Sequence, residues 1–368
     1  MSATTQPLFD LTLTQEQALM RESVRRFANS ELRTASRKAD EAGEAPKGFA
    51  GKVLELGFNG VSIPEELGGF GAARSPVSNM LIAEDLAWGD MSLAIAALSS
   101  LSFINTVIDA GSAAQQQALL PAFTSDAPPH GTVAFMEPGV RFNAQKPKAS
   151  ARKSGGGYVL DGVKTMVPLG LSAKHLVVVA QEEGGGPAAF VIEQGQSGLR
   201  GEREQYMGLR PLELAKLTLE GVKVDAANKL ERFDLDRFID LSRIGVAALS
   251  LGVGQAVLDY VKAYCNDRVA FGEPITHRQA VAFMIADIAI ELEGMRMLVY
   301  RAAARAERGL PFRREAYFAR VQCAEKGMKI GTDGVQLLGG HGFIREHLVE
   351  LWYRNLRAVG ILEGCVTL

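Results

Sequence analysis

The chain has 368 residues, of which 47% are hydrophobic and 22% charged, the composition of an ordinary globular protein with room for two or three subdomains. The 40 basic and 42 acidic residues give a formal net charge of -2, and no basic block predicts a nucleic-acid partner. No run of 18 apolar residues predicts a membrane span, and three isolated cysteines favour a reducing, cytoplasmic setting over a disulfide framework.

Residues 1–130 are predicted to form a helical domain, and the first 17 residues show no secretory signal. Thr14 and Gln17 are spaced as a capping box, in which two side chains satisfy free amides at the start of a helix. The spacing of one buried helical face follows, at Met20, Val24, Phe27 and Ala28. Two further helices and a turn are expected, over residues 79–88, 113–123 and 63–71 respectively.

Residues 131–230 are predicted to form a β domain. Short β-branched segments bounded by glycine indicate strands of a mostly antiparallel sheet, at residues 158–164, 175–181, 188–193 and 216–224. Glycine-rich stretches at residues 154–158 and 182–187 predict hairpin turns between them. No alternation of strands with helices appears, so a dinucleotide-binding domain of the Rossmann type is not expected.

Residues 231–368 return to helical periodicity. One amphipathic run begins at Ile244, and Thr276 and Gln279 are spaced as a second capping box before another. Long helices joined by short connections predict an antiparallel four-helix bundle. The predicted fold class is therefore α+β, mainly α, with a helical, a β and a helical domain in that order.

The final eight residues, 361–368, contain a single charged side chain, Glu363, next to Gly364. Such a carboxylate is either an exposed residue near a chain end or a base kept away from water. The second possibility suits difficult proton abstraction, because burial raises the pKa of a carboxyl group. Because Gly364 has no side chain, the backbone next to Glu363 could approach a ligand closely.

Four segments occur in a distinctive order: IPEELGGFG (63–71), RVAFGEPI (268–275), VQLLGGHGF (335–343) and LEG (362–364). In order and spacing they resemble the acyl-CoA dehydrogenases over nearly the whole chain. The resemblance implies an FAD-dependent oxidoreductase of lipid metabolism that acts on an acyl-CoA thioester. In that reaction a carboxylate takes the α-proton while the β-hydrogen leaves as hydride to FAD N5. The resemblance also implies an electron-transfer flavoprotein as electron acceptor, and a homotetramer or a heterotetramer with a homologous chain.

The resemblance assigns roles around the thioester. Glu363 aligns with the usual base, and Ser242 occupies the position from which some members supply a base instead, so Glu363 has no competitor. Arg243 and Asp240 match the CoA side of the pocket, and Gly364 would lie against flavin or substrate. Considered alone, Arg243 is equally well explained as a helix-surface arginine.

A second set of residues is assigned to FAD. Arg268 and Phe271 match residues that meet the FAD of a neighbouring subunit, and a guanidinium fork suits a pyrophosphate. Gln336, Gly339 and Gly340 match the adenosine end of FAD. Simpler explanations stay open, since Arg268 could complement a helix C-terminus and the glycine pair could cap a helix.

The positions that would face the flavin ring depart from the family. Met136 replaces a threonine, Val167, Pro168 and Leu169 replace an Ile-Thr-Asn segment, and Cys365 replaces a second threonine. Three missing hydrogen bonds of about 0.5–1.5 kcal/mol each would weaken FAD binding by about one to three orders of magnitude. Most members also continue beyond this motif, so we expect that further segment to be dispensable or supplied by a partner.

Three functions are therefore compatible with the sequence. The first is an acyl-CoA dehydrogenase, and the second is a non-catalytic or half-site subunit that completes a partner chain's FAD site. The third is a flavin-dependent oxidase or hydroxylase, which would not need Glu363. No metal site is expected, because the five histidines lack ligand spacing, and His341 is expected to face solvent.

Overall fold

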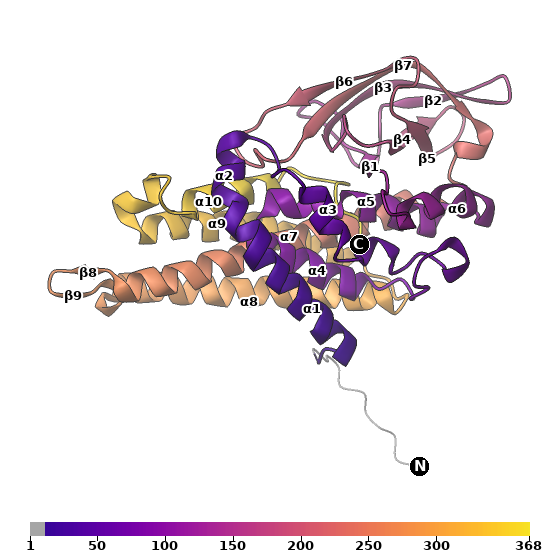
Figure 1. The fold of residues 1–368 in the computed structure, drawn as a ribbon. Helices are drawn as coiled ribbons and strands as arrows, with labels where there is room; N and C mark the ends of the chain where they lie inside the picture. Colours follow the sequence, from indigo (N-terminus) through magenta and orange to yellow (C-terminus); the bar gives the residue numbers. More distant parts are fainter. Residues whose placement is uncertain (1–11) are drawn as a thin grey trace, which may run out of the picture.

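The computed structural model describes residues 12–368 and confirms the helical, β and helical order (Figure 1). The secretory-signal prediction falls largely on residues 1–11, which lie outside the described residues. The helices that precede the sheet are α1 (Gln15–Phe27), α2 (Thr34–Ala42), α3 (Phe49–Leu54), α4 (Pro76–Gly89), α5 (Met91–Ala110) and α6 (Ala113–Leu119). A π-helical stretch, Ala28–Arg33, joins α1 to α2.

The first capping box is confirmed and the second is wrong. The Thr14 hydroxyl accepts the Gln17 N–H, and the Thr14 N–H donates to the Gln17 side chain, both at 3.1 Å. Thr276 instead lies in a 3₁₀ turn, Ile275–His277, and the next helix begins at Gln279 after Arg278. The turn shifts the N-cap position to Arg278, whose side chain has no oxygen to accept a helix amide.

The middle region is a seven-stranded sheet of order β1-β4-β2-β3-β7-β6, with β5 paired to β4. Its strands are β1 (Gly131–Ala134), β2 (Ser150–Ser154), β3 (Gly157–Pro168), β4 (His175–Glu182), β5 (Pro187–Glu193), β6 (Leu199–Glu204) and β7 (Leu214–Asp225). The mostly antiparallel prediction is confirmed, since among the described strands only β1–β4 and β2–β4 pair in parallel. The pairing of β3 with β7 shifts register between Lys164 and Val167, and Met166 there has a φ of 52°.

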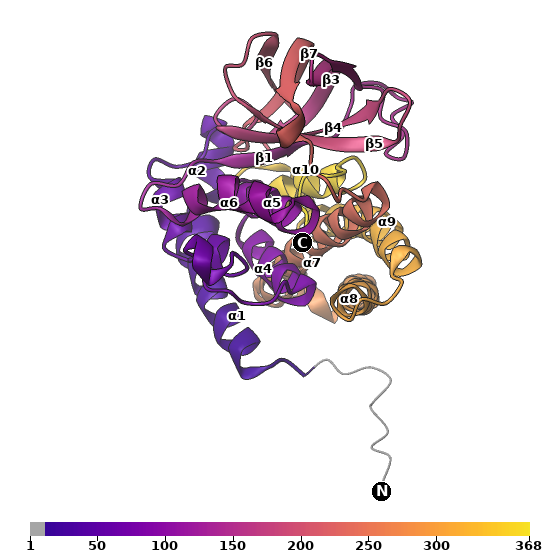
Figure 2. The same ribbon diagram turned by 90° about the vertical axis from the view of Figure 1, so that its right-hand side faces the viewer.

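The remaining helices are α7 (Leu235–Asp267), α8 (Gln279–Glu307), α9 (Arg313–Leu337) and α10 (Val349–Val359). A short hairpin, β8 (Val269–Ala270) and β9 (Glu273–Pro274), separates α7 from α8. Figure 2 shows α7 in the centre of the helical layer, below α5 and the sheet. Close approach requires glycine on α7, because a Cβ at Gly252 would clash with the Glu84 carbonyl of α4.

Two helices, Met91–Ala110 and Leu235–Asp267, are long and apolar enough to span a membrane by composition alone. Within the fold, however, 94% and 78% of their most apolar windows are buried inside the protein. Their apolar character is therefore explained by their position as core helices. Phe103 of α5 and Phe238 of α7, for example, pack in one apolar cluster with Val177 of the sheet.

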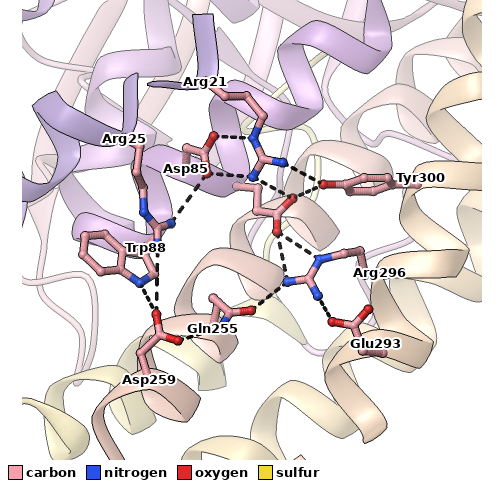
Figure 3. A network of polar contacts seen from close by, with 10 residues as sticks. Arg21, Arg25, Asp85, Trp88, Gln255, Asp259, Glu293, Arg296 and Tyr300 are labelled. Carbon is pink, nitrogen blue, oxygen red and sulfur yellow. Dashed lines mark hydrogen bonds and ion pairs between the residues drawn. The ribbon is translucent and has the colours of Figure 1, made fainter. Parts of the chain in front are cut away.

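A partly buried polar network joins four helices (Figure 3). Arg21 of α1 forms two hydrogen bonds with Asp85 of α4, at 2.7 and 2.8 Å. On α4, Trp88 donates to Asp259 of α7 at 2.9 Å. Elsewhere in the network, Arg25 of α1 pairs with Asp85 and Asp259. Glu84 of α4 accepts hydrogen bonds from Arg296 and Tyr300 of α8. Because Asp85 is only 2% exposed, its carboxylate depends on these cations for stabilisation.

Replacing Asp85 by alanine is expected to lower the free energy of unfolding by about 3 kcal/mol, because Arg21 then lacks its buried partner. The matched control is Glu22→Ala, which removes an exposed ion pair with Arg26 on the same helix, α1. We expect Glu22→Ala to alter the free energy of unfolding by no more than about 0.5 kcal/mol. Urea unfolding followed by circular dichroism measures both, and equal losses would contradict the role given to the network.

Candidate active site

The segment that carries Glu363 lies inside the protein. Leu362, Cys365, Val366, Thr367 and Leu368 are each at most 4% exposed. Figures 1 and 2 place the end of this segment in the middle of the molecule, among α4, α5 and α7. The Glu363 side chain is 16% exposed, so it is partly sequestered from solvent.

Hydrogen bonds from three helices fix the backbone on both sides of Glu363. The Leu362 carbonyl accepts from Arg320 Nη2 of α9 at 2.9 Å, and the Gly364 N–H donates to Ser242 Oγ of α7 at 2.8 Å. Further along, the Thr367 N–H donates to Ser102 of α5 at 3.1 Å. Asn105 of α5 and Arg74 complete the set by donating to the Thr367 and Leu368 carbonyls.

Gly364 has a φ of 69°, and a Cβ there would clash with the ring of Phe135. Glycine is therefore required both by conformation and by space. The Gly364 backbone approaches the ring of Phe135, the residue that follows β1. Phe142 packs edge-on against the same ring, with centroids 5.8 Å apart.

Three charged groups from two helices, α7 and α9, lie around the Glu363 carboxylate. Glu363 Oε1 lies 3.6 Å from Arg243 Nε and 3.9 Å from Arg320 Nε, and Arg243 lies 3.6 Å from Asp240. In this cluster, four buried atoms have no hydrogen-bond partner among residues 12–368: Glu363 Oε2, Arg243 Nε, Arg320 Nε and Asp240 Oδ1. Buried polar atoms are normally satisfied, so this group is suited to a polar ligand or water.

Burial sets the ionisation of the neighbouring groups. It raises the pKa of Asp240 to about 6, against the opposing effect of Arg243. Burial also raises the pKa of the Cys365 thiol to about 12, so this group stays protonated at neutral pH. In contrast, burial lowers the pKa of the Arg320 guanidinium, an effect that the Glu363 carboxylate opposes.

A cavity of about 830 Å³ opens beside Arg243. Its lining side chains come from α7, α8, the α8–α9 connection, α9 and the loop after β1: Gln145, Arg243, Arg305, Pro311, Arg313, Arg314, Glu315 and Tyr317. Four arginines against one glutamate make this cavity suited to an anionic ligand. Arg243 belongs to both the cavity and the Glu363 cluster, so the two are adjacent.

The sheet presents an apolar wall to Glu363. Met136 is 7% exposed, and its Sδ accepts the Glu363 N–H at 3.4 Å, although a thioether is a weak acceptor. Met136 and Met166 share the large core cluster with Leu209, Leu212 and Leu214. Val167 is 1% exposed, and the Pro168 carbonyl accepts the Thr132 hydroxyl at 2.5 Å.

The structure divides the predicted site residues into two distant groups. Asp240, Arg243, Gly364, Cys365 and Met136 lie around Glu363, whereas Val167 packs in a separate apolar cluster within the sheet. Arg268, Phe271, Gln336, Gly339 and Gly340 lie toward the far end of the bundle, with the β8–β9 hairpin (Figure 1). Arg243 and Arg268 are about 25 residues apart on α7, or about 37 Å along its axis. One chain therefore does not bring both groups to one place.

The far group is strongly exposed. Phe271 is 95% exposed at the tip of the β8–β9 hairpin, with a φ of 56°. Phe343, at the end of the 3₁₀ turn that contains Gly339 and Gly340, is 89% exposed. His341 is half-buried, and its Nδ1 lies 2.7 Å from the Tyr264 hydroxyl, so it faces solvent only in part.

Sequence reasoning missed two features of the site. Arg320 was overlooked, although it stands in a stripe of small buried residues on α9 and so breaks an apolar pattern: Ala316, Ala319, Cys323 and Gly327. The arginines at the start of α9 and at the end of α8 were also missed. Their signal is a local excess of positive charge, which becomes a cavity lining only through tertiary packing.

Comparison with known proteins finds the same order of three domains. The chain matches "Acyl-CoA dehydrogenase, N-terminal domain" over residues 14–127, "middle domain" over 132–222 and "C-terminal domain" over 235–366. It is 31% identical over 357 residues to the mitochondrial short-chain specific acyl-CoA dehydrogenase of Rattus norvegicus, covering 94% of this chain and 86% of the relative. It is also 31% identical over 363 residues to the caffeyl-CoA reductase-Etf complex subunit CarC of Acetobacterium woodii, covering 95% of each.

A solved structure gives the same result. Butyryl-CoA dehydrogenase from Megasphaera elsdenii superposes with a TM-score of 0.88 at 28% identity, covering 96% of this chain and 95% of the other. Matches to all three domains, together with relatives aligned over nearly their whole length, leave one assignment. The chain belongs to the acyl-CoA dehydrogenase family of FAD-dependent oxidoreductases.

Proposed function

We propose that the chain catalyses α,β-dehydrogenation of an acyl-CoA thioester, with Glu363 removing the α-proton. The supporting observation is the Glu363 carboxylate itself. One of its oxygens is buried without a hydrogen-bond partner among the described residues, next to an arginine-lined cavity. The peptide groups on both sides are held by Arg320 and Ser242, so the base is positioned before a substrate arrives.

The α-proton of a thioester is too weakly acidic for a freely solvated carboxylate. A partly buried one, with its backbone fixed, is better suited to remove it. The arginine-lined cavity supports CoA as the carrier, because Arg305, Arg313 and Arg314 can meet its phosphates. Arg243 and Asp240 would then lie between the phosphates and the thioester. Bound FAD supplies the N5 atom that accepts the β-hydride.

The residues present fit FAD in two parts. Met136, with the neutral Cys365 thiol in the same apolar cluster, suits the flat face of a flavin ring, and Val167 supports the sheet behind it. The exposed far group, Arg268, Phe271, Gln336, Gly339 and Gly340, would hold the adenosine and pyrophosphate of an FAD bound to a neighbouring chain. We therefore propose a tetramer, either homomeric or with a homologous chain.

An electron-transfer flavoprotein is the proposed electron acceptor. The relative from Acetobacterium woodii is named as a subunit of an Etf complex, which supports this partner. A cytoplasmic location is also proposed, in keeping with three buried cysteines that form no disulfide.

Replacing Glu363 by glutamine is expected to reduce turnover at least about 10³-fold, because the amide keeps the shape of the side chain but cannot take a proton. The measurement is flavin bleaching and steady-state turnover with a panel of straight- and branched-chain acyl-CoA thioesters. Lys329→Gln serves as a control, since the Lys329 side chain is half exposed on α9 and pairs with Asp333, four residues further along the same helix. Unchanged bleaching by Glu363→Gln would show that Glu363 is not the base.

Asp240 gives the fold a predictable pH dependence. Its pKa rises from 3.8 to about 6 on folding, so the folded state favours the protonated carboxyl, and this contribution to stability is lost as pH rises through that window. Asp240→Asn is therefore expected to be more stable than the parent by about 2–3 kcal/mol at pH 7.5, with a smaller difference at pH 4.5. Thermal unfolding at both pH values tests this, and an equal difference at both would contradict it.

A half-site subunit is the second candidate, and one contact favours it. The Met136 thioether already occupies the Glu363 N–H and helps to close the sheet side of the site, whereas the far group is exposed and ready for a partner. In this candidate the chain completes the FAD site of a homologous chain while its own sheet stays without flavin.

The two candidates predict different flavin contents. As a homomeric dehydrogenase, the purified chain carries FAD and is bleached by acyl-CoA. As a half-site subunit it is colourless alone, becomes yellow only after co-expression with a homologous chain, and gains flavin when Met136→Thr and Pro168→Thr restore the missing hydroxyls. Absorbance at the flavin maximum, divided by protein concentration, decides between them.

A further inference from the structure

We infer that Arg320 is a positioning residue for Glu363: it fixes the peptide group before the base and keeps a positive charge beside the carboxylate. This inference rests on the proposed role of Glu363. It assigns a role to a residue of α9 that lies outside the motifs by which the site was found.

The contacts of Arg320 are directed at one short stretch of chain. Its Nη2 donates to the Leu362 carbonyl at 2.9 Å, and its Nε lies 3.9 Å from Glu363 Oε1. Arg320 is 8% exposed, and its Nε has no hydrogen-bond partner in the part of the chain that the structure describes. One guanidinium therefore contacts both the backbone before the base and the side chain of the base.

Burial of the Arg320 guanidinium lowers the stability of the fold, so stability does not explain why an arginine lies there. A guanidinium removed from water loses hydration energy, and burial lowers the pKa of Arg320 accordingly. The stripe around it consists of small apolar residues such as Ala316, Ala319 and Cys323, so an apolar side chain would suit the packing. The positive charge of Arg320 is compensated mainly by the Glu363 carboxylate. The presence of an arginine at this position is therefore linked to that carboxylate.

Structural fixation of the segment does not by itself require Arg320. The N–H groups of Ile361 and Leu362 already donate to the Ala358 carbonyl of α10, at 2.8 and 2.9 Å. The Gly364 N–H is held by Ser242. What Arg320 adds is control of the one peptide carbonyl that immediately precedes Glu363, and therefore of the direction in which the carboxylate points.

Arg243 and Arg320 have different access to a ligand. Arg243 lines the 830 Å³ cavity and is 16% exposed at its side chain, so it can turn to an incoming thioester or CoA group. Arg320 is not part of that lining and is anchored to the Leu362 carbonyl. When a substrate engages Arg243, Arg320 is the cation that stays with Glu363. The pair thus divides into a ligand-facing arginine and a base-facing arginine.

The test separates proton removal from overall turnover. The flavin-loaded protein is incubated in D₂O with a 3-thia acyl-CoA, in which sulfur replaces the β-carbon so that no hydride can leave. Exchange of the α-protons, followed by NMR, then reports only the step carried out by the base. Turnover of the corresponding acyl-CoA, its KM, and thermal unfolding are measured on the same proteins.

Arg320→Gln is expected to slow α-proton exchange and kcat about 100-fold with KM changed less than about 3-fold, because a small misorientation of a base costs rate rather than binding. Arg320→Lys keeps the charge but loses the fork, and is expected to be about 10-fold slower than the parent. Lys329→Gln, on the exposed side of the same helix, is expected to exchange like the parent.

Parent-like exchange in both Arg320 variants would overturn the inference. Equal loss in Arg320→Gln and Arg320→Lys, matched by equal loss of thermal stability, would also overturn it in favour of a purely structural role. Should Arg320→Gln fail to fold, Arg320→Lys decides alone: slower exchange at unchanged KM supports the inference, and parent-like exchange refutes it. Glu363→Gln keeps the two claims apart, because exchange that persists in that variant contradicts the proposed base itself.

Discussion

The whole site depends on the burial of residues 362–368 between helices. A chain segment can enter an apolar interior only if its peptide groups find partners, since each unpaired one costs free energy. Here the partners come from α5, α7 and α9, through Ser102, Asn105, Ser242 and Arg320. These contacts convert a stretch that would otherwise fray into a fixed support for one carboxylate.

That support in turn depends on how firmly the helices are held. Arg21, Asp85, Asp259 and their partners tie α1, α4, α7 and α8 into one unit, while α9 and α10 pack on the other side of α7. A single 33-residue helix, α7, carries Ser242 and Arg243 near its start and ends at Asp267, immediately before Arg268 and the exposed hairpin. In the proposed tetramer, the Glu363 site and the far group would serve FAD molecules bound to different chains. Because both lie along α7, this one helix holds them at a fixed separation.

Local sequence patterns predicted the fold well and the site only in part. Periodicity and glycine-bounded β-branched runs gave the order of helices and strands, because those patterns reflect the direct environment of each residue. The Thr14 capping box was predictable since all its contacts are local, whereas the one at Thr276 failed when a 3₁₀ turn moved the helix start. Glu363 stood out as a lone charge near Gly364.

The groups around Glu363 could not be predicted in the same way. Arg320 reaches Leu362 across 42 positions of sequence, and Met136 reaches Glu363 across 227, so neither contact leaves a local pattern. Ser242 was considered only as a position without a carboxylate, yet it holds the Gly364 amide. Only the packing of α7, α9 and the sheet brings these residues together.

The tight packing of α7 also bears on how this scaffold could acquire new substrates. Gly245 meets the Val366 backbone and Gly252 meets α4, with no room for a Cβ at either position. Mutational drift on α7 is therefore constrained, since any displacement of that helix would also displace the residues beside Glu363. The loop after β1 is freer: Val140 is fully exposed, and Gln145 already borders the cavity. Substitutions in this loop would therefore change the lining of the cavity without moving α7 or the residues beside Glu363.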